Sequence, residues 1–312
     1  MDSTSTVISK FAHDTRLRHV THVKNRGRAS TRNHGIDLAR GEYIAFLDAD
    51  DRLSRERLQR QVTYLDSHHD ISGVGSCMNS IDEHGQLLTE QFYTVPLGTD
   101  RIACLMLVEC TLAQPSIMVR RLAFSQYRYD DEFELAEDYE LWARMIKTCK
   151  FANLPERLTD YRRHSRQVSI TEKAQNQAAD FEVWRRQLAM LGIHATERAL
   201  IRHGCLFKFK GRQPVLEQTG APLDIHYLRW ARAWLEALLK GNDDHGIYPE
   251  PAFTNMIAAR WLFACRKAAR NSPWRLVALE FFASRLLRAV GFQVGQRLKS
   301  QLSTRRADHN AN

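Results

Sequence analysis

The sequence predicts an α/β fold followed by a helical region. Apolar runs and helical patterns alternate over about the first 172 residues, which is typical of a sheet covered by helices. From about residue 173 the pattern is almost purely helical. The charge changes at the same place. The 312 residues carry a net charge of +9, and residues 173–312 alone hold 22 basic and 11 acidic residues, a net of +11. We therefore expect two domains, 1–172 and 173–312.

The first hundred residues contain the clearest strand and helix patterns. Residues 43–47 form an apolar run without alternation, bounded by Gly41 and an acidic cluster, so we expect a strand buried on both faces. Residues 28–40 have a helical pattern that ends at the same glycine. The other elements expected here are strands at 17–23 and 71–78 and helices at 7–11 and 54–65.

The remainder of the chain adds mostly helices. A short apolar run at 117–119 and the segment 151–161 contribute further strand residues to the front domain. Prolines separate the helical segments of the C-terminal region, as expected for residues that end helices. The expected helices are 102–112, 137–147, 177–191, 224–240, 251–270 and 274–299.

Composition excludes several classes of protein. Hydrophobic residues make up 44% and charged residues 26%, which excludes a disordered or collagen-like chain. The six cysteines form no CxxC pair and predict reduced, mostly buried thiols. The first residues do not have the pattern of a signal peptide, and no stretch reaches the roughly 18 apolar residues of a membrane span. We therefore expect a cytoplasmic protein that can lie at the inner face of a membrane.

Three carboxylates, Asp48, Asp50 and Asp51, follow the expected strand at 43–47. Ligands of open α/β sheets bind at the carboxyl ends of the strands. Carboxylates that crowd such an edge repel one another unless a cation neutralises them, and Mg²⁺ or Mn²⁺ is the natural partner. The alternative is a helix start, where acidic residues favour the positive end of the helix dipole.

Three further groups of residues have functional alternatives to a purely structural role. Arg32 lies in the second turn of a helix that begins near Gly27, where it could face a phosphate, or could be solvated. Glu137 and Asp138 open a helix, and Asp138 could act as a general base or simply favour the helix start. His164, in a basic segment, could contact a metal or a phosphate.

Taken together, these residues resemble family 2 glycosyltransferases of the GT-A fold. The resemblance covers about residues 2–170. It is carried by NRG-x4-RN-x-G (25–35), ARGEYIAFLDADD (39–51), EDYELW (137–142) and YRRHSRQVS (161–169). Each motif is moderately specific, and their order and spacing together are strongly specific.

The resemblance implies a function and a set of roles. The family moves a sugar, with inversion, from a nucleotide-diphosphate donor, usually UDP- or dTDP-linked, to an acceptor hydroxyl. By resemblance, Asp138 is the catalytic base, and Mn²⁺ or Mg²⁺ is the cofactor. The resemblance also assigns Arg32, Asp48, Asp50 and Glu137 to donor binding and Asp50, Asp51 and His164 to the metal. The expected acceptor is a saccharide or a lipid-linked molecule, in the synthesis of a cell-surface polysaccharide or glycolipid.

The start of the chain departs from the family pattern. Asp2-Ser3-Thr4 resembles only the end of the family's DDGSTD-type element. We therefore expect the front domain to be a partial GT-A domain that lacks an N-terminal strand–helix–strand, on the order of 30–40 residues. The expectation that follows is a truncated form of a longer protein.

The C-terminal region contains five of the six tryptophans as well as the positive charge. One interpretation is a helical bundle with tryptophans in its core. The other is an interfacial surface, because Trp274–Lys299 is apolar over much of its circumference and carries several arginines, as helices on anionic membranes do. Nucleic acid is not an expected partner, because no helix-turn-helix, RNA-binding or zinc pattern accompanies the charge.

Three alternatives to an active transferase stay open at the level of sequence. An inactive truncated paralogue would keep the motifs without turnover. A basic membrane-surface binding protein would use only the C-terminal region. A nucleotidyltransferase also uses acidic metal ligands, but typically has a Gly-rich, Lys/Arg-bearing N-terminal loop that this chain does not show.

Overall fold

The computed structural model describes residues 4–89, 92–165, 167, 171–207, 223–284 and 286. The helices are α1 Thr4–Ser9, α2 Gly27–Leu38, α3 Arg57–Ser67, α4 Thr99–Leu105, α5 Glu137–Met145, α7 Lys173–Met190, α8 Glu197–Phe207, α10 Ile225–His245, α11 Ala252–Ala268 and α12 Trp274–Ala283. The strands are β1 Tyr43–Ala45, β2 Arg52–Leu53, β3 Ile71–Ile81, β4 Met118–Arg120 and β5 Lys150–Arg162, and two 3₁₀ turns are η1 Gln114–Ser116 and η2 Arg121–Ser125.

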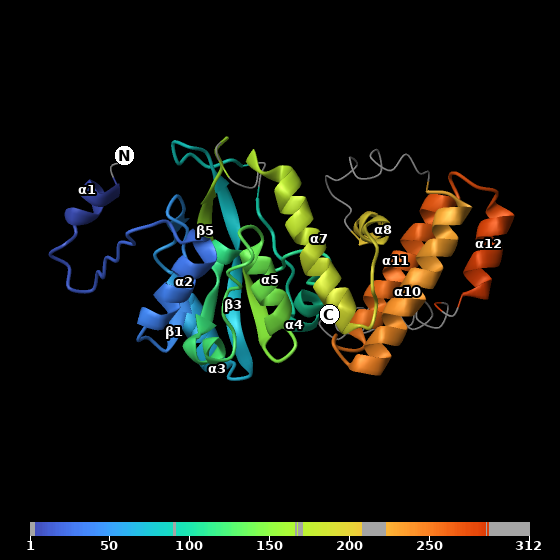
Figure 1. Cartoon of the computed structure of the whole chain (residues 1–312), viewed down its shortest axis with the longest axis horizontal. Helices are drawn as coiled ribbons and strands as arrows, with labels where there is room; N and C mark the ends of the chain where they lie inside the picture. Colours follow the sequence, from blue (N-terminus) through green and yellow to red (C-terminus); the bar gives the residue numbers. More distant parts are fainter. Residues whose placement is uncertain are drawn as a thin grey trace, which may run out of the picture.

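The five strands form one mixed sheet in the order β1-β4-β3-β5-β2. The long central strands β3 and β5 run parallel, with Val74 opposite Ala152. The other neighbouring strands are antiparallel. Figure 1 shows this sheet in the left half of the molecule, with the helices of the C-terminal region to its right. The predicted α/β class and the helical C-terminal region are confirmed.

Each face of the sheet packs against a different layer of helices. On one face, Leu65 of α3 packs with Val74 of β3 and Leu154 of β5. On the other face, Val119 of β4 and Phe151 of β5 belong to the larger core, which also contains α4 and α5. Adjacent residues of a strand point to opposite faces, so the apolar run around β4 supplies side chains to both layers.

The C-terminal helices share the larger core with the front domain. Trp142 of α5, Trp184 of α7 and Trp261 of α11 are all buried in one hydrophobic cluster. The indole of Trp184 also donates a hydrogen bond to the Tyr139 hydroxyl of α5, at 3.1 Å. Since a single core crosses residue 172, the helical region is packed firmly against the sheet domain.

Two strand predictions for the front of the chain need correction. Residues 17–23 do not form a strand, because no described strand lies beside them to complete the hydrogen bonds, and Val20 and Val23 are exposed. The strand predicted at 43–47 is only Tyr43–Ala45, and it is not buried on both faces. It lies at the edge of the sheet, and β4 is its only partner among the described strands.

The helix predictions for the C-terminal region are mostly confirmed. Helix α8 was not predicted, and the helix predicted at 274–299 is described only over Trp274–Ala283 and at residue 286. The remaining residues of that prediction, among them Arg288, Arg297 and Lys299, lie outside the described residues. Within the described ranges, no helix combines the length and the apolar character needed to cross a bilayer.

A buried arginine ties α3 to the sheet. Arg57 is 1% exposed, and its guanidinium donates hydrogen bonds to the backbone carbonyls of Pro115 at 2.6 Å and Phe46 at 2.8 Å. Its Nε donates to Gln61, whose amide donates in turn to the carbonyl of Ser116 at 2.8 Å. Burial lowers the pKa of Arg57 to about 10, so the group still carries its charge at neutral pH. These bonds hold the segment after β1 against η1.

We predict that Arg57→Met destabilises the protein by about 3 kcal/mol, because it leaves buried carbonyl oxygens without donors. Chemical denaturation followed by circular dichroism measures the free energy of unfolding.

The matched control lies on the same helix. The Arg60 side chain is 57% exposed and, within the described part of the chain, bonds only to Glu56, so Arg60→Met should change stability by less than about 0.5 kcal/mol. Equal stability losses for the two variants would show that the buried bonds of Arg57 are not the stabilising feature.

Candidate functional site

A pocket of about 480 Å³ lies where α2, the segment after β1, β3, β5, the start of α5 and the first turns of α7 meet. This volume is typical of a site for a small molecule. The predicted site residues that line it are Arg32, Asp48, Asp50, Glu137, Asp138 and His164. Asp51 is the one predicted site residue that is not part of its wall.

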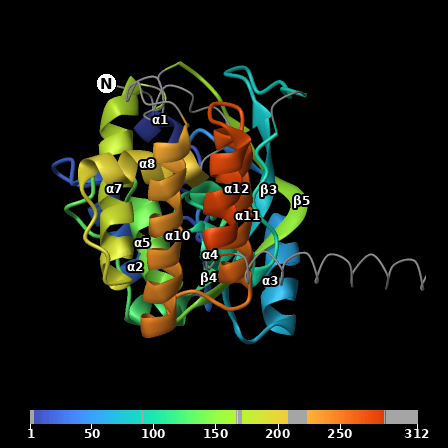
Figure 2. The same cartoon turned by 90° about the vertical axis from the view of Figure 1, so that its right-hand side faces the viewer.

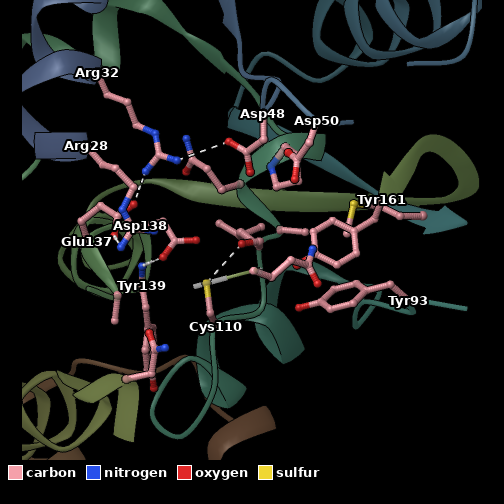
Figure 3. A pocket seen from close by; sticks show the side chains of 18 of the residues that line it. Arg28, Arg32, Asp48, Asp50, Tyr93, Cys110, Glu137, Asp138, Tyr139 and Tyr161 are labelled. Carbon is pink, nitrogen blue, oxygen red and sulfur yellow. Dashed lines mark hydrogen bonds and ion pairs between the residues drawn. The ribbon is translucent and has the colours of Figure 1, made fainter. Parts of the chain in front are cut away.

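A buried carboxylate holds α2 against α5 at this pocket. Glu137, at the start of α5, is 2% exposed. It accepts a hydrogen bond from Nη1 of Arg32, and its other oxygen lies 3.2 Å from Nη2 of Arg28. Figure 3 shows both arginines reaching from α2 toward Glu137. A buried charge is tolerated when it is paired in this way.

The second branch of the Arg32 guanidinium points to the acidic segment. Its Nη2 lies 3.4 Å from Oδ1 of Asp48, so Arg32 bridges Glu137 and Asp48. Burial raises the pKa of Asp48, Arg32 lowers it, and neighbouring Asp50 raises it further. The net shift is upward. A positive group bound in the pocket would therefore stabilise the ionised form of Asp48.

Asp50 and His164 meet at the edge of the pocket. Oδ2 of Asp50 lies 3.1 Å from Nε2 of His164, although the two residues are 114 positions apart. Asp51 turns away, and its Oδ1 accepts a hydrogen bond from the backbone N–H of Arg162 on β5, at 2.8 Å. Its Oδ2 is buried and has no hydrogen-bond partner among the described residues, and burial raises the pKa of Asp51 to about 7.

Asp138 points into the pocket from the first turn of α5, with Asp48 and Asp50 on one side and Tyr93 and Tyr161 on another (Figure 3). Burial, and then the neighbouring carboxylate of Glu137, raise the pKa of Asp138 to about 6. One of its oxygens accepts a hydrogen bond from the backbone N–H of Tyr139, at 2.8 Å. A carboxylate with this pKa is ionised at neutral pH and is a stronger base than an ordinary aspartate.

The residue before this helix has a strained backbone. Ala136 has φ 56° and ψ 26°, the left-handed conformation that non-glycine residues avoid. Such a conformation costs of order 1 kcal/mol and persists where the surroundings enforce it. Ala136 itself lines the pocket. The strain therefore coincides with the turn that directs Glu137 and Asp138 inward.

Several lining residues were not identified from the sequence. Arg28 could have been, because it precedes Arg32 by one helical turn. Asn176 and Asp180 come from α7, which the sequence placed in the helical region. Tyr93 and Gln114 come from a loop and a 3₁₀ turn that carry no motif.

The side chains of Asp50 and His164 at the edge of the pocket are suitable ligands for a divalent cation. A carboxylate and an imidazole converge there, and both can ligate Mn²⁺ or Mg²⁺. Among the described residues, no three His, Cys, Asp or Glu side chains converge on one point. A cation held here would thus take its remaining ligands from a bound molecule and from water, as Mg²⁺ commonly does beside phosphates.

Part of this chain matches a known protein family. Residues 1–128 match the sequence model of the family described as Glycosyl transferase family 2. An uncharacterized glycosyltransferase of Methanocaldococcus jannaschii is 34% identical over 150 residues, which are 48% of this chain and 51% of that protein. An uncharacterized glycosyltransferase of Haemophilus influenzae is 28% identical over 55% of each chain. The chain thus spans about half the length of these two relatives.

Two further comparisons cover more of the chain. The amylovoran biosynthesis glycosyltransferase AmsE of Erwinia amylovora is 26% identical over 61% of this chain and 70% of that protein. The crystal structure of S. aureus TarS has a TM-score of 0.49 and 17% identity over 89% of this chain and 47% of that one. The family match includes Arg32 and the acidic segment 48–51, so residues 1–128 form part of a glycosyl transferase family 2 domain, and the mixed α/β sheet agrees with its GT-A type.

Proposed function

We propose that this protein is an inverting glycosyltransferase. Its donor is a nucleotide-diphosphate sugar, UDP-linked, and its acceptor is a hydroxyl of a saccharide or of a lipid-linked molecule. The observation that carries the proposal is the pocket itself, which combines Asp138 with an acidic edge and two arginines in a chain of this family. The relative AmsE is named for the biosynthesis of amylovoran, which supports a role in the synthesis of a cell-surface polysaccharide or glycolipid.

In this proposal the donor lies along the Arg32 and Asp48 side of the pocket. Asp48 and Asp50 accept hydrogen bonds from the hydroxyls of the nucleoside or the sugar. Arg32 is fixed between Glu137 and Asp48, so it presents its guanidinium without the entropy cost of ordering a free side chain. Glu137 supports binding indirectly, because it is buried and holds both arginines.

Asp50 and His164 are the proposed ligands of the cation, and Asp51 is the third predicted one. A bound Mn²⁺ or Mg²⁺ supplies positive charge to the diphosphate, which becomes more negative as it leaves. Asp51 and Asp50 have different surroundings. Its Oδ1 is already bonded to the backbone of Arg162, which anchors the acidic segment to β5.

Asp138 performs the proton transfer in this proposal. It takes the proton of the acceptor hydroxyl, the hydroxyl oxygen forms the new bond to the anomeric carbon, and the bond to the diphosphate oxygen breaks. The attack comes from the face opposite the leaving group, so the configuration inverts in one step without a covalent enzyme intermediate. Raising the pKa of Asp138 to about 6 strengthens it as a base while leaving it ionised at neutral pH.

We predict that Asp138→Asn lowers kcat about 10²- to 10⁴-fold, because it removes the general base. Thermal stability should not fall, since asparagine keeps an oxygen for the Tyr139 N–H and removes a half-buried charge. The assay measures release of the nucleoside diphosphate from a panel of UDP-sugars with Mn²⁺, in the presence of saccharide acceptors, with differential scanning fluorimetry alongside.

Asp100→Asn is the matched control, because Asp100 is also an aspartate in the first turn of a helix but is exposed on α4. It should retain wild-type turnover, and EDTA should stop the wild-type reaction. Unchanged kcat in Asp138→Asn would contradict the assignment of the base. Binding of UDP with Mn²⁺ by the wild type without any turnover would favour the inactive paralogue.

We predict that kcat/KM of the wild type falls about tenfold per pH unit below about 6, because the base must be deprotonated. The contribution of Asp138 to the free energy of unfolding changes in the opposite direction and rises as the pH falls. The pKa of Asp138 in the folded state lies above the ordinary value of 3.8. As the pH falls from about 6 to 3.8, the folded protein takes up a proton at Asp138 before the unfolded chain does, and this stabilises the folded state. A pH–rate profile with intrinsic fluorescence at each pH checks both statements. An acid limb near 3.8 instead of 6 would contradict the assignment.

A further inference from the structure

Helix α12 presents an apolar surface on the side that faces away from the protein. Trp274, Leu279 and Phe282 are 70%, 67% and 72% exposed, and Leu276 is 38% exposed. Together with Arg275, these residues define what we call the α12 outer face. Figures 1 and 2 show that α12 is the helix farthest from the sheet, beside α10 and α11. Four apolar side chains left in solvent on one short helix indicate a binding surface.

The geometry of the helix separates this face from the packed one. Val277 is buried and Phe281 packs against the core. At about 100° per residue, Leu279 and Phe282 lie on the side opposite Val277. Leu279 and Phe282 therefore point away from the side of α12 that packs on α10 and α11.

The charge of α11 and α12 is mostly positive, and the nearby acidic Glu236 of α10 accepts a hydrogen bond from the Ser284 hydroxyl at 3.4 Å. Residues 251–284 contain five basic residues and one acidic residue. The acidic one, Glu280, is turned inward and is 12% exposed. It lies 2.8 Å from Arg229 and 2.8 Å from Arg232 of α10, so its charge is already neutralised. The exposed or half-exposed basic residues are Arg266, Lys267, Arg270 and Arg275, whereas Arg260 is partly buried and lies over the Phe207 ring of α8.

We propose that the α12 outer face docks onto an anionic lipid surface. Exposed tryptophan and phenylalanine beside unbalanced basic residues are the combination that binds the headgroup region of such bilayers. Arg275 lies 5.8 Å from the centre of the Trp274 ring, so charge and apolar surface are adjacent. A second copy of this chain is the weaker occupant, because pairing two such faces would bring like charges together.

The test uses the full chain and sedimentation with vesicles. We expect binding to phosphatidylcholine vesicles that contain phosphatidylglycerol, weakening with added salt, and no binding to phosphatidylcholine alone. The double variant Leu279→Glu with Phe282→Glu should bind at least about tenfold more weakly and keep the wild-type Tm, since both side chains are mostly exposed and the ring contact of Phe282 is with its neighbour Phe281 on the same helix.

The control variant, Val23→Glu with Leu122→Glu, makes the same change in charge at side chains that are 101% and 80% exposed elsewhere. It should bind as the wild type does. Equal binding by both double variants would overturn the proposal. So would dimerisation without vesicle binding, which would make a second copy the occupant. The proposal would also be overturned if the wild type did not bind vesicles and the α12 variant had a lower Tm. That result would mean that the outer face is covered by the C-terminal residues of the same chain.

Discussion

The buried carboxylate of Glu137 is the constraint on which the pocket depends. It is removed from water and needs positive partners, and Arg28 and Arg32 of α2 provide them. This requirement fixes α2 against the start of α5. It also directs the free branch of Arg32 to Asp48 and places the next residue along the helix, Asp138, inside the pocket. The strained Ala136 belongs to the same arrangement.

A second buried charge, on the other side of the sheet, also fixes a helix in place. Arg57 has no carboxylate within ion-pair distance among the described residues and binds backbone carbonyls instead. Those carbonyls belong to the segments that precede the acidic residues and that contain Gln114 and Pro115 of the pocket wall. The ion pairs of Glu137 and the hydrogen bonds of Arg57 together explain how loops that are distant in sequence form the wall of one pocket.

The sequence predicted what local patterns determine. β3 and α5 follow from apolar periodicity, and Arg32, Asp48 and Asp138 were found because they belong to compact motifs. The prediction of a strand at 17–23 is wrong, because a strand needs a neighbouring strand to bond to and a local sequence pattern does not show whether one is present. Asn176 and Asp180 could not be found, because only the packing of α7 on α5 brings them to the pocket. Asp50 and Asp51 look equivalent in sequence, yet one faces His164 and the other faces the β5 backbone.

The central claim is that a single carboxylate acts opposite the leaving diphosphate. The most direct test is the anomeric configuration of the product, read from the proton coupling constant of the transferred sugar by NMR. Single displacement with Asp138 as the base predicts the anomer opposite to that of the donor. A product that keeps the donor's configuration would contradict the account, because it requires a different mechanism.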